Sequence, residues 1–475
     1  MNDPRIDAAI DDRLHILNRL ASTWRIPGFS LAITYGADAA TYAWGMRDAG
    51  RRLPMTVATR VPLGSLSKAL IAAVAAQRVA EQVTDWSSAV GSFLPASHRD
   101  VSLAHMLSHS SGMPSYDLLL HHTADGTRAA LLDRLRHLAG ARAPGASYLY
   151  SNIMFIAACG VLEDLTGLPW ERQFEDLLRA IGVEEGGGET APPHLWDDER
   201  GVFVVGDPGQ IPPLARPISA LACDSREMVA IMRLHLFGTA GPARLLGEDA
   251  LAALRRSRIP VPAVGYPASA TVTGYGLGWV TGLLGEHELL LHAGSVGDTR
   301  GMTALLPGLG AGVSLLCNTD CHHSLVHPEC CFPCAVVFRV IDWLCGTRSM
   351  PPGEPAPPPG RTSDVPPVVR PVPAAAERDL VGSYAHPGFG TITVAPADDD
   401  RLGLRYGRFQ GLLTRQRPDT LTAFSRERDG PVLPLRRAGR SLLARMDPSV
   451  PSFPFTRTDG TNRRDGTDRT DGTAG

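Results

Sequence analysis

Lys68 is the one lysine in this chain of 475 residues, and the rest of its 46 lysine and arginine residues are arginines. Arginine stays protonated at any ordinary pH, whereas a lysine amine can lose its proton when it is desolvated or lies near another cation. Ser65 precedes Lys68 by three residues, and on a helix this spacing places hydroxyl and amine on one face within contact range. A nucleophile with an adjacent base has this arrangement. Ser-x-x-Lys also arises by chance, so the pair alone is only a hypothesis.

The surrounding residues predict a long, buried helix over residues 65–82. Alanine and valine recur there at helical spacing, and Leu70, Ile71 and Val74 make the first half apolar on nearly every side. Ser65 is therefore expected at the helix N-terminus, where free N–H groups and the helix dipole stabilise developing negative charge.

The rest of the first 345 residues alternates helix and strand signals. Residues 6–23 have apolar side chains at helical spacing, and residues 28–48 predict two strands joined by a Gly-Ala-Asp turn. Helical segments and Gly/Pro loops follow, strand signals return over 271–318, and the apolar residues 335–344 predict a buried helix. This order predicts an α+β fold with an antiparallel sheet.

Composition changes sharply after this region. Dense proline between 351 and 373 predicts a stiff, extended linker, and the short alternating stretches that follow predict a β-meander closed into a small barrel or sandwich. The final residues repeat Asp-Gly-Thr and are expected to be disordered, with a calcium-binding turn as the alternative. The predicted domains are a main domain over 1–345, a Pro-rich linker over 346–376, a β-domain over 377–457 and a tail over 458–475.

The overall composition excludes several classes of function. Net charge is −3, and the arginines are scattered among acidic residues, which argues against a nucleic-acid binder. No apolar run is long enough to span a bilayer, so no membrane partner is expected. The N-terminus is acidic, without the basic and apolar regions of a signal peptide, and a cytoplasmic protein is expected.

Cysteines gather near the end of the main domain. Of the eight in the chain, six lie between 317 and 345, together with three histidines. Cys331-x-x-Cys334 could indicate zinc, but the spacing fits no common zinc pattern and the segment is otherwise apolar. Free cysteine behaves there as a small core hydrophobe, so neither a metal, a cofactor nor a disulfide is expected. The histidines of this cluster are His322, His323 and His327.

Two further motifs follow Ser65-x-x-Lys68. They are Tyr150-x-Asn152 and His292-x-Gly294, the second at the end of a strand-like run. In order and spacing the three resemble the motifs of the serine β-lactamase and penicillin-binding-protein superfamily, with the Tyr-x-Asn form of class C β-lactamases. His-x-Gly resembles the replacement for Lys-Thr-Gly in related esterases, peptidases and thioesterases. The stretch HMLSHSSGMP over 105–114 resembles the LLxHTSGxP segment of the same group.

This resemblance covers about residues 7–345 and implies a β-lactamase/transpeptidase-like core. Such a core has an antiparallel sheet flanked by helices and an all-helical insertion. The architecture of the whole chain is most similar to penicillin-binding-protein-type thioesterases, which add a small C-terminal lipocalin-like β-domain after a linker.

The resemblance also implies roles for the motif residues. Ser65 would attack a carbonyl carbon, Lys68 would accept the hydroxyl proton, and Tyr150 would relay a proton to the leaving group. Asn152 would orient Lys68 or the substrate amide, and His292 would bind or polarise near the tyrosine.

Further residues are implied around these. The N–H groups of Ser65 and Ser295 would bind the oxyanion. Gly294 would line the substrate site. Asp298 and Arg300, just after the third motif, are also candidates for lining it, with a structural ion pair as an equal alternative. Apart from the resemblance, Arg457 is a candidate for reaching a substrate carboxylate, although a surface arginine at the end of a strand is the favoured interpretation. The remaining nearby side chains are expected to be structural: Ser67 facing away from Lys68, His105 and His109 in local hydrogen bonds, and Tyr148 in a core position.

The resemblance leaves several functions open. Stand-alone thioesterases of this type release a nonribosomal peptide from a peptidyl carrier protein and close it into a macrocycle, and this is the favoured interpretation. A cytosolic esterase, D-aminopeptidase or D-amino-acid amidase is the alternative. A β-lactamase or DD-carboxypeptidase is disfavoured because His292 replaces the lysine that helps to bind a substrate carboxylate. A non-catalytic scaffold is disfavoured because all motif residues are present.

Overall fold

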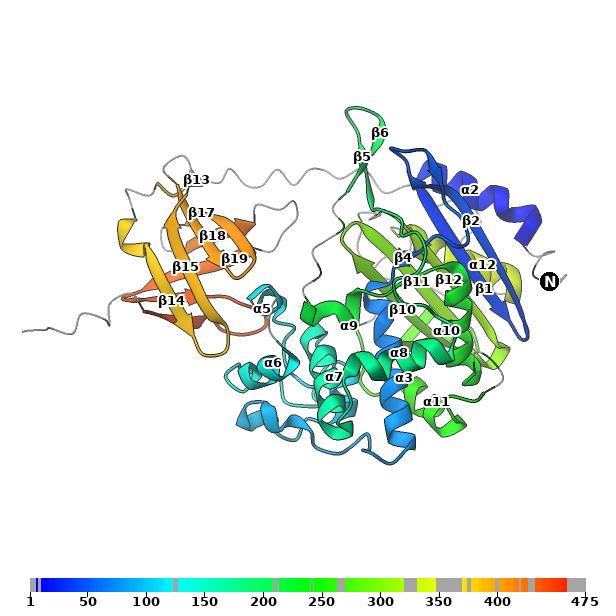
Figure 1. Ribbon diagram of the computed structural model, residues 1–475, viewed down its shortest axis with the longest axis horizontal. Coiled ribbons are helices and arrows are strands. Elements are labelled where there is room, and N and C mark those ends of the chain that lie inside the picture. Colours follow the sequence, from blue (N-terminus) through cyan, green and yellow to red (C-terminus); the bar gives the residue numbers. More distant parts are fainter. Residues whose placement is uncertain are drawn as a thin grey trace, which may run out of the picture. The chain divides into compact units, whose positions relative to one another are not determined.

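The computed structural model of the chain forms two units (Figure 1). By internal contacts the first comprises residues 1–115, 126–133 and 140–364, and the second comprises 116–125, 134–139 and 365–475. The residues that the structure describes are 6, 10–122, 127–206, 208, 211, 213–239, 241, 243–262, 270–319, 331–346, 370–373, 377–397, 401–417, 420–425 and 432–458.

The first unit is built on an eight-stranded antiparallel sheet with the strand order β3-β2-β1-β12-β11-β10-β9-β8. The turn after β1 pairs Tyr35 with Asp38, which confirms the hairpin predicted over residues 28–48. N- and C-terminal parts of the unit therefore meet in the middle of the sheet, where β1 pairs with β12. The strands are β1 (Gly28–Tyr35), β2 (Asp38–Asp48), β3 (Leu53–Pro54), β8 (Ala270–Tyr275), β9 (Val280–Leu284), β10 (His287–Val296), β11 (Thr299–Leu306) and β12 (Ala311–Cys317).

Helices cover both faces of this sheet. The central strands carry apolar side chains on both faces, and each face must be covered to bury them. Phe29, Leu31 and Ile33 of β1 pack in one cluster with α2 (Leu14–Thr23) and α12 (Phe332–Cys345). On the opposite face α10 (Ser225–Phe237) contacts β1 and β12. The helix predicted over residues 6–23 is confirmed from Leu14 to Thr23; a 3-10 turn, η1 (Asp11–Arg13), precedes it, and residues 7–9 lie outside the described part of the chain. The predicted helix after residue 331 is confirmed as α12, which is buried over most of its length.

The Ser-x-x-Lys segment begins with the 3-10 turn η2 (Gly64–Leu66) and continues as α3 (Ser67–Ala80). Every residue from Ser67 to Ala76 is buried, so the predicted buried helix is confirmed. Its first turn is tighter than an α-helix, and this turn packs against β10 and β11.

Between β4 and β8 the first unit is mainly helical. Contacts of α3 with α7, α8, α9 and α11 make it the central helix of this layer, as Figure 1 shows. Two short antiparallel pairs, β4 with β7 and the hairpin of β5 with β6, had no clear signal in the sequence. These elements are β4 (Val61–Pro62), α4 (Leu103–Leu107), α6 (Arg128–Leu135), α7 (Asn152–Thr166), α8 (Trp170–Ala180), β5 (His194–Asp197), β6 (Val202–Val205), α9 (Arg216–Ser219), β7 (Ala222–Cys223) and α11 (Glu248–Arg255).

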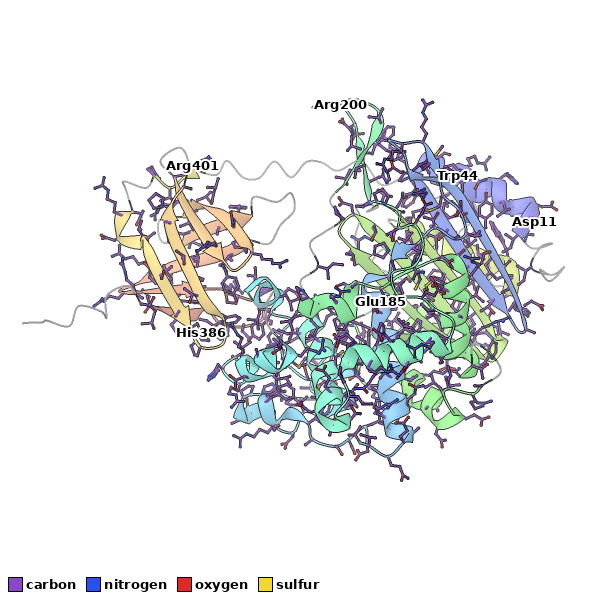
Figure 2. The ribbon with its side chains drawn as sticks, viewed as in Figure 1. Asp11, Trp44, Glu185, Arg200, His386 and Arg401 are labelled. Carbon is purple, nitrogen blue, oxygen red and sulfur yellow. The ribbon has the colours of Figure 1, made fainter. Side chains whose placement is uncertain are left out.

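No single helix in the described part of the chain is long and apolar enough to cross a membrane. Within the described residues one bent pair, α7 and α8, passes by length and composition when taken together, and its two helices are bent by 96°. The β5–β6 hairpin projects from the first unit, with Arg200 in its turn (Figure 2).

The second unit is a closed antiparallel barrel. Eight strands follow the order β17-β16-β15-β14-β21-β20-β19-β18, and β18 pairs again with β17, while β13 adds to the outside of β17. Closure of this kind removes the exposed sheet edges of a meander and agrees with the predicted lipocalin-like domain. The strands are β13 (Arg370–Pro371), β14 (Gly382–His386), β15 (Gly390–Pro396), β16 (Leu402–Tyr406), β17 (Phe409–Arg417), β18 (Thr420–Ser425), β19 (Val432–Ala438), β20 (Ser441–Ala444) and β21 (Phe453–Arg457).

An aromatic cluster ties a distant part of the chain into this unit. Tyr116, just before α5 (Asp117–His122), is fully buried, and its ring lies 5.4 Å from Phe389 and 6.1 Å from Phe453. Its hydroxyl donates to the carbonyl of Ala139. The sequence patterns gave no sign that residues from the first 345 would join the second unit.

Three sequence predictions lie mostly or wholly outside the described residues. They are the Pro-rich linker over 346–376, the disordered tail over 458–475, and the part of the cysteine–histidine cluster between 320 and 330. The predicted domain limits remain predictions.

Candidate active site

Four side chains from two motifs meet at the start of α3. Lys68 Nζ donates hydrogen bonds to Ser65 Oγ and to Asn152 Oδ1, each at 2.8 Å. Tyr150 donates its hydroxyl to the same Ser65 Oγ, also at 2.8 Å. The serine oxygen is thus held between an amine and a phenol, the contact that a proton transfer to or from it requires.

The environment of Lys68 is protected from solvent. The residue has 0% exposure, while Ser65 is only partly buried and so remains open to a substrate. The Nζ atom of Lys68 lies 4.9 Å from the ring centroid of Tyr150 and 5.5 Å from that of Phe155. The amine therefore lies between aromatic rings and out of contact with solvent.

Tyr150 and Asn152 flank the beginning of α7. The backbone N–H of Asn152 donates to Ser115 Oγ at 3.0 Å, and Ser151 Oγ donates to the carbonyl of Pro114 at 2.9 Å. The first of these hydrogen bonds satisfies a backbone N–H that a helix N-terminus otherwise leaves without a partner, and the second joins the N-cap residue to the same segment. The segment before α5 therefore fixes the turn that presents Tyr150.

The third motif lies on β10, beyond the part of that strand that pairs with β9. Successive residues of a strand face opposite sides, so His292 and Gly294 share one face. A Cβ on Gly294 would lie 2.0 Å from the carbonyl oxygen of Leu63, so this face is the one that touches η2. The His-x-Gly spacing therefore places two residues on the face of β10 that η2 touches. His292 contributes a side chain there, and Gly294 leaves the space that the serine turn occupies.

His292 is a buried, neutral histidine. Its Nδ1 donates to the carbonyl of Ala293 at 2.6 Å, and its Nε2 accepts from the hydroxyl of Tyr275 at 2.9 Å. Burial, followed by the nearby Lys68, lowers the pKa of His292 to about 3. The tyrosine bonded to His292 is thus Tyr275, which the sequence analysis did not single out. An action of His292 beside Tyr150 stays a prediction.

Two glycines allow β10 and η2 to approach closely. Gly64 has φ of +53°, and a Cβ there would lie 2.4 Å from the carbonyl oxygen and 2.6 Å from the nitrogen of Ser295. The backbone of Ser295 therefore lies against the residue that precedes Ser65. This close contact supports, without testing it, the assignment of the Ser65 and Ser295 N–H groups as an oxyanion hole.

Gly64→Ala is expected to lower kcat/KM by about 100-fold or more, because the added methyl group must push β10 away from the serine turn and the backbone prefers glycine at this φ. Steady-state kinetics on an ester substrate, with the melting temperature recorded in parallel, would test this. Gly308→Ala is the matched control, since no atom lies within 4 Å of a Cβ at that position. Equal activity of both variants would contradict the proposed role of the contact.

Other predicted site residues are less directly connected to this network. Asp298 follows β10 and lies against Gly206, where a Cβ would come within 2.6 Å of its carboxylate. Arg457 donates to the carbonyls of Asp379 and Val381 within the second unit and lies over the ring of Tyr384. Binding of substrate by Asp298 or Arg457 stays a prediction.

Of the two histidines expected to make local hydrogen bonds, His105 does so, whereas the partner of His109 lies 42 residues further along the chain. His105 completes a capping box with Ser102 at the start of α4, as its predicted local hydrogen bonding requires. His109 accepts the N–H of Ser151, and burial, followed by Lys68 and His292, holds its pKa well below the usual value. Among the residues that the structure describes, no three His, Cys, Asp or Glu side chains gather into a possible metal site.

Several characterised proteins are similar to this chain in sequence. An Unguisins hydrolase of Aspergillus campestris is 26% identical over 368 residues, which make up 71% of this chain and 65% of that protein. A D-aminopeptidase of Cereibacter sphaeroides is 30% identical over 218 residues, or 41% of this chain and 42% of the enzyme. The chain spans less than two thirds of the length of the two fungal hydrolases it matches.

Solved structures show the same fold. The crystal structure of SurE matches with a TM-score of 0.61 and 21% identity, covering 96% of this chain and 100% of SurE. A D-amino acid amidase from Ochrobactrum anthropi, complexed with D-phenylalanine, matches with a TM-score of 0.54 and 18% identity, over 72% of this chain and 96% of the amidase. Residues 7–324 match the Beta-lactamase family. The chain therefore belongs to this family, within the serine-hydrolase-type superfamily.

Proposed function

We propose that the protein forms an acyl-enzyme on Ser65 from a peptidyl thioester, ester or amide, and transfers the acyl group to the amine of the same peptide, closing a macrocycle. The observation that carries the acyl-enzyme step is the contact of Ser65 Oγ with both Lys68 Nζ and the Tyr150 hydroxyl, each at 2.8 Å.

The proposed chemistry starts from a neutral Lys68. Ser65 Oγ attacks the carbonyl carbon while its proton passes to Lys68 Nζ. The tetrahedral intermediate then expels the thiol, alcohol or amine, which receives a proton through Tyr150. In the second half-reaction an amine attacks the acyl–Ser65 ester, its proton returns through the same groups, and Ser65 leaves as the hydroxyl. An amide bond replaces the ester bond, and no cofactor is needed for the balance.

The lack of a positive charge at the third motif supports an activity other than that of a β-lactamase or DD-carboxypeptidase. His292 is buried and its pKa is lowered to about 3, so it offers no positive charge at neutral pH. The lysine that it replaces in those enzymes helps to bind a substrate carboxylate. A substrate without a free carboxylate at this point, such as a peptidyl thioester, fits the site better.

The configuration of the acyl residue is the second part of the proposal. We infer a D-residue because the relatives include a D-aminopeptidase and a D-amino acid amidase. The choice of macrocyclisation depends on the resemblance to penicillin-binding-protein-type thioesterases. The expected acyl donor in the cell is a peptidyl carrier protein.

A second function, hydrolysis, is favoured by the names of the relatives, which include an Unguisins hydrolase and a D-aminopeptidase. The chemistry differs only in that water attacks the acyl–Ser65 ester. Both functions use the same four side chains, so the product must decide between them.

The deciding experiment uses a linear peptidyl thioester with a D-residue at the acyl end and a free amine at the other end. Wild type and Ser65→Ala would be incubated with it and the products read by mass spectrometry, with the L-diastereomer as a control. A Ser65-dependent product of the free acid's mass minus water supports the macrocyclase. Free acid alone would replace that proposal with a hydrolase, and equal turnover of the L-diastereomer would overturn the D-preference.

A further inference from the structure

His109 holds the backbone on both sides of Tyr150. Its carbonyl oxygen accepts the N–H of Leu149 at 2.8 Å, and its Nδ1 accepts the N–H of Ser151 at 3.1 Å. Tyr150 is thus bracketed by two hydrogen bonds that end on one residue. Such a bracket fixes the direction in which the Tyr150 side chain leaves the backbone.

The imidazole also forms a wall against the Tyr150 ring. The two ring centroids lie 4.1 Å apart with the planes tilted by 35°, and the His109 ring lies 4.9 Å from that of Phe155. His109 has 0% exposure, so neighbouring side chains hold this wall in place. The Tyr150 hydroxyl, 2.8 Å from Ser65 Oγ, lies at the far end of the ring that His109 supports.

The backbone of His109 is unusual and fits the same purpose. Its φ is +56°, a conformation in which asparagine, aspartate and histidine are several-fold enriched among non-glycine residues. Strained positions of this kind persist when the surroundings determine them and often occur at functional sites. Here the left-handed turn lets carbonyl and Nδ1 of one residue reach toward N–H groups two residues apart.

His109 does not itself move protons in this arrangement. Because Nδ1 accepts the N–H of Ser151, the proton of the neutral ring is on Nε2. Nε2 has no hydrogen-bond partner among the described residues. A neutral imidazole adds no positive charge beside Lys68, and its contacts with the Tyr150 segment leave positioning as its function.

We propose that His109 is a positioning residue that holds the Tyr150 hydroxyl on the path between Ser65 and the leaving group. This inference rests on the proposed acyl-enzyme chemistry, but not on the choice between cyclisation and hydrolysis. Misplacement of Tyr150 should slow acylation most when the leaving group needs a proton. A leaving group that departs as a stable anion should be much less affected.

The test compares two esters that give the same acyl-enzyme, N-acetyl-D-phenylalanine methyl ester and its p-nitrophenyl ester. For each, kcat/KM reports the steps up to acylation. His109→Phe keeps a ring but loses the acceptor for Ser151, and is expected to lower kcat/KM about 10-fold more for the methyl ester than for the p-nitrophenyl ester. His109→Asn keeps an acceptor near the Nδ1 position and tolerates positive φ, so a smaller difference is expected.

A double-mutant cycle completes the test. In a Tyr150→Phe background, His109→Phe should lose its selective effect on the methyl ester, because the hydroxyl that it positions is absent. A selective effect that persists in this background would overturn the proposal, as would equal slowing of both esters by His109→Phe and His109→Asn. His105→Asn serves as the control in the same segment, and His109→Asn carries the test if His109→Phe does not fold.

Failure of this proposal and failure of the acyl-enzyme itself give different results. If Ser65→Ala turned over both esters as fast as wild type, turnover would not pass through Ser65 and the proposed function would fail. If turnover depends on Ser65 but the ester ratio does not respond to His109, only the positioning role fails.

Discussion

Ser65→Ala is expected to abolish the acyl-enzyme and to lower kcat on the order of 10⁴- to 10⁶-fold, as loss of a covalent nucleophile does in serine hydrolases. The reason is that Ser65 Oγ is the oxygen contacted by both Lys68 Nζ and the Tyr150 hydroxyl. Labelling with a fluorescent fluorophosphonate, followed by peptide mass spectrometry, would locate the modified residue and show whether labelling is lost. Steady-state kinetics would measure the fall in kcat.

Ser67→Ala is the matched control for this experiment. Ser67 lies two residues away on the same turn, is fully buried, and its hydroxyl has no hydrogen-bond partner among the described residues. Its replacement is expected to leave labelling and turnover within a few-fold of wild type. Undiminished labelling of the Ser65→Ala protein would show that another residue is the nucleophile.

Lys68→Arg is expected to be almost as damaging as Lys68→Ala, with a loss on the order of 10³-fold in kcat/KM. Arginine cannot release a proton at working pH, so it cannot accept one from Ser65. It is also larger than the space available, because Lys68 has 0% exposure and lies against the rings of Tyr150 and Phe155. Steady-state kinetics with the p-nitrophenyl ester would measure the loss.

A further variant, Lys68→Met, separates the chemistry of Lys68 from its packing. Lys68→Met keeps an unbranched side chain of similar length without the amine, so it should fold like wild type and be as inactive as Lys68→Ala. Melting temperatures would show which variants remain folded. A largely active Lys68→Arg enzyme would refute the assignment of Lys68 as the base.

Local spacing determined part of this site. A separation of three residues on a helix places two side chains on one face, so the contact between Ser65 and Lys68 could be predicted from the sequence. Period-two alternation likewise placed His292 and Gly294 on the same face of a strand. The buried helix and the antiparallel sheet followed from hydrophobic patterns of the same short range. The same patterns left a small barrel and a sandwich open for the second unit, and only the pairing of β18 with β17 decided for the closed barrel.

Contacts between segments far apart in the sequence could not be predicted from local spacing. Tyr150 could be associated with Ser65 only through resemblance to a family, since no local rule relates residues in separate motifs. The hydrogen bond between His292 and Tyr275, and the two that His109 makes around Tyr150, were not anticipated. A histidine in a sequence gives no sign of whether its partner is a neighbour or a residue from another element.

The sequence by itself therefore determined which chemical groups are present and how neighbours along one helix or strand are oriented, because backbone geometry repeats over a few residues. The tertiary structure decided the rest. The close contact of Gly64 with Ser295, the bracket around Tyr150, and the inclusion of residues 116–125 and 134–139 in the second unit depend on how separate elements pack. Packing of this kind is set by the shapes of many side chains at once, which no short pattern in the sequence records.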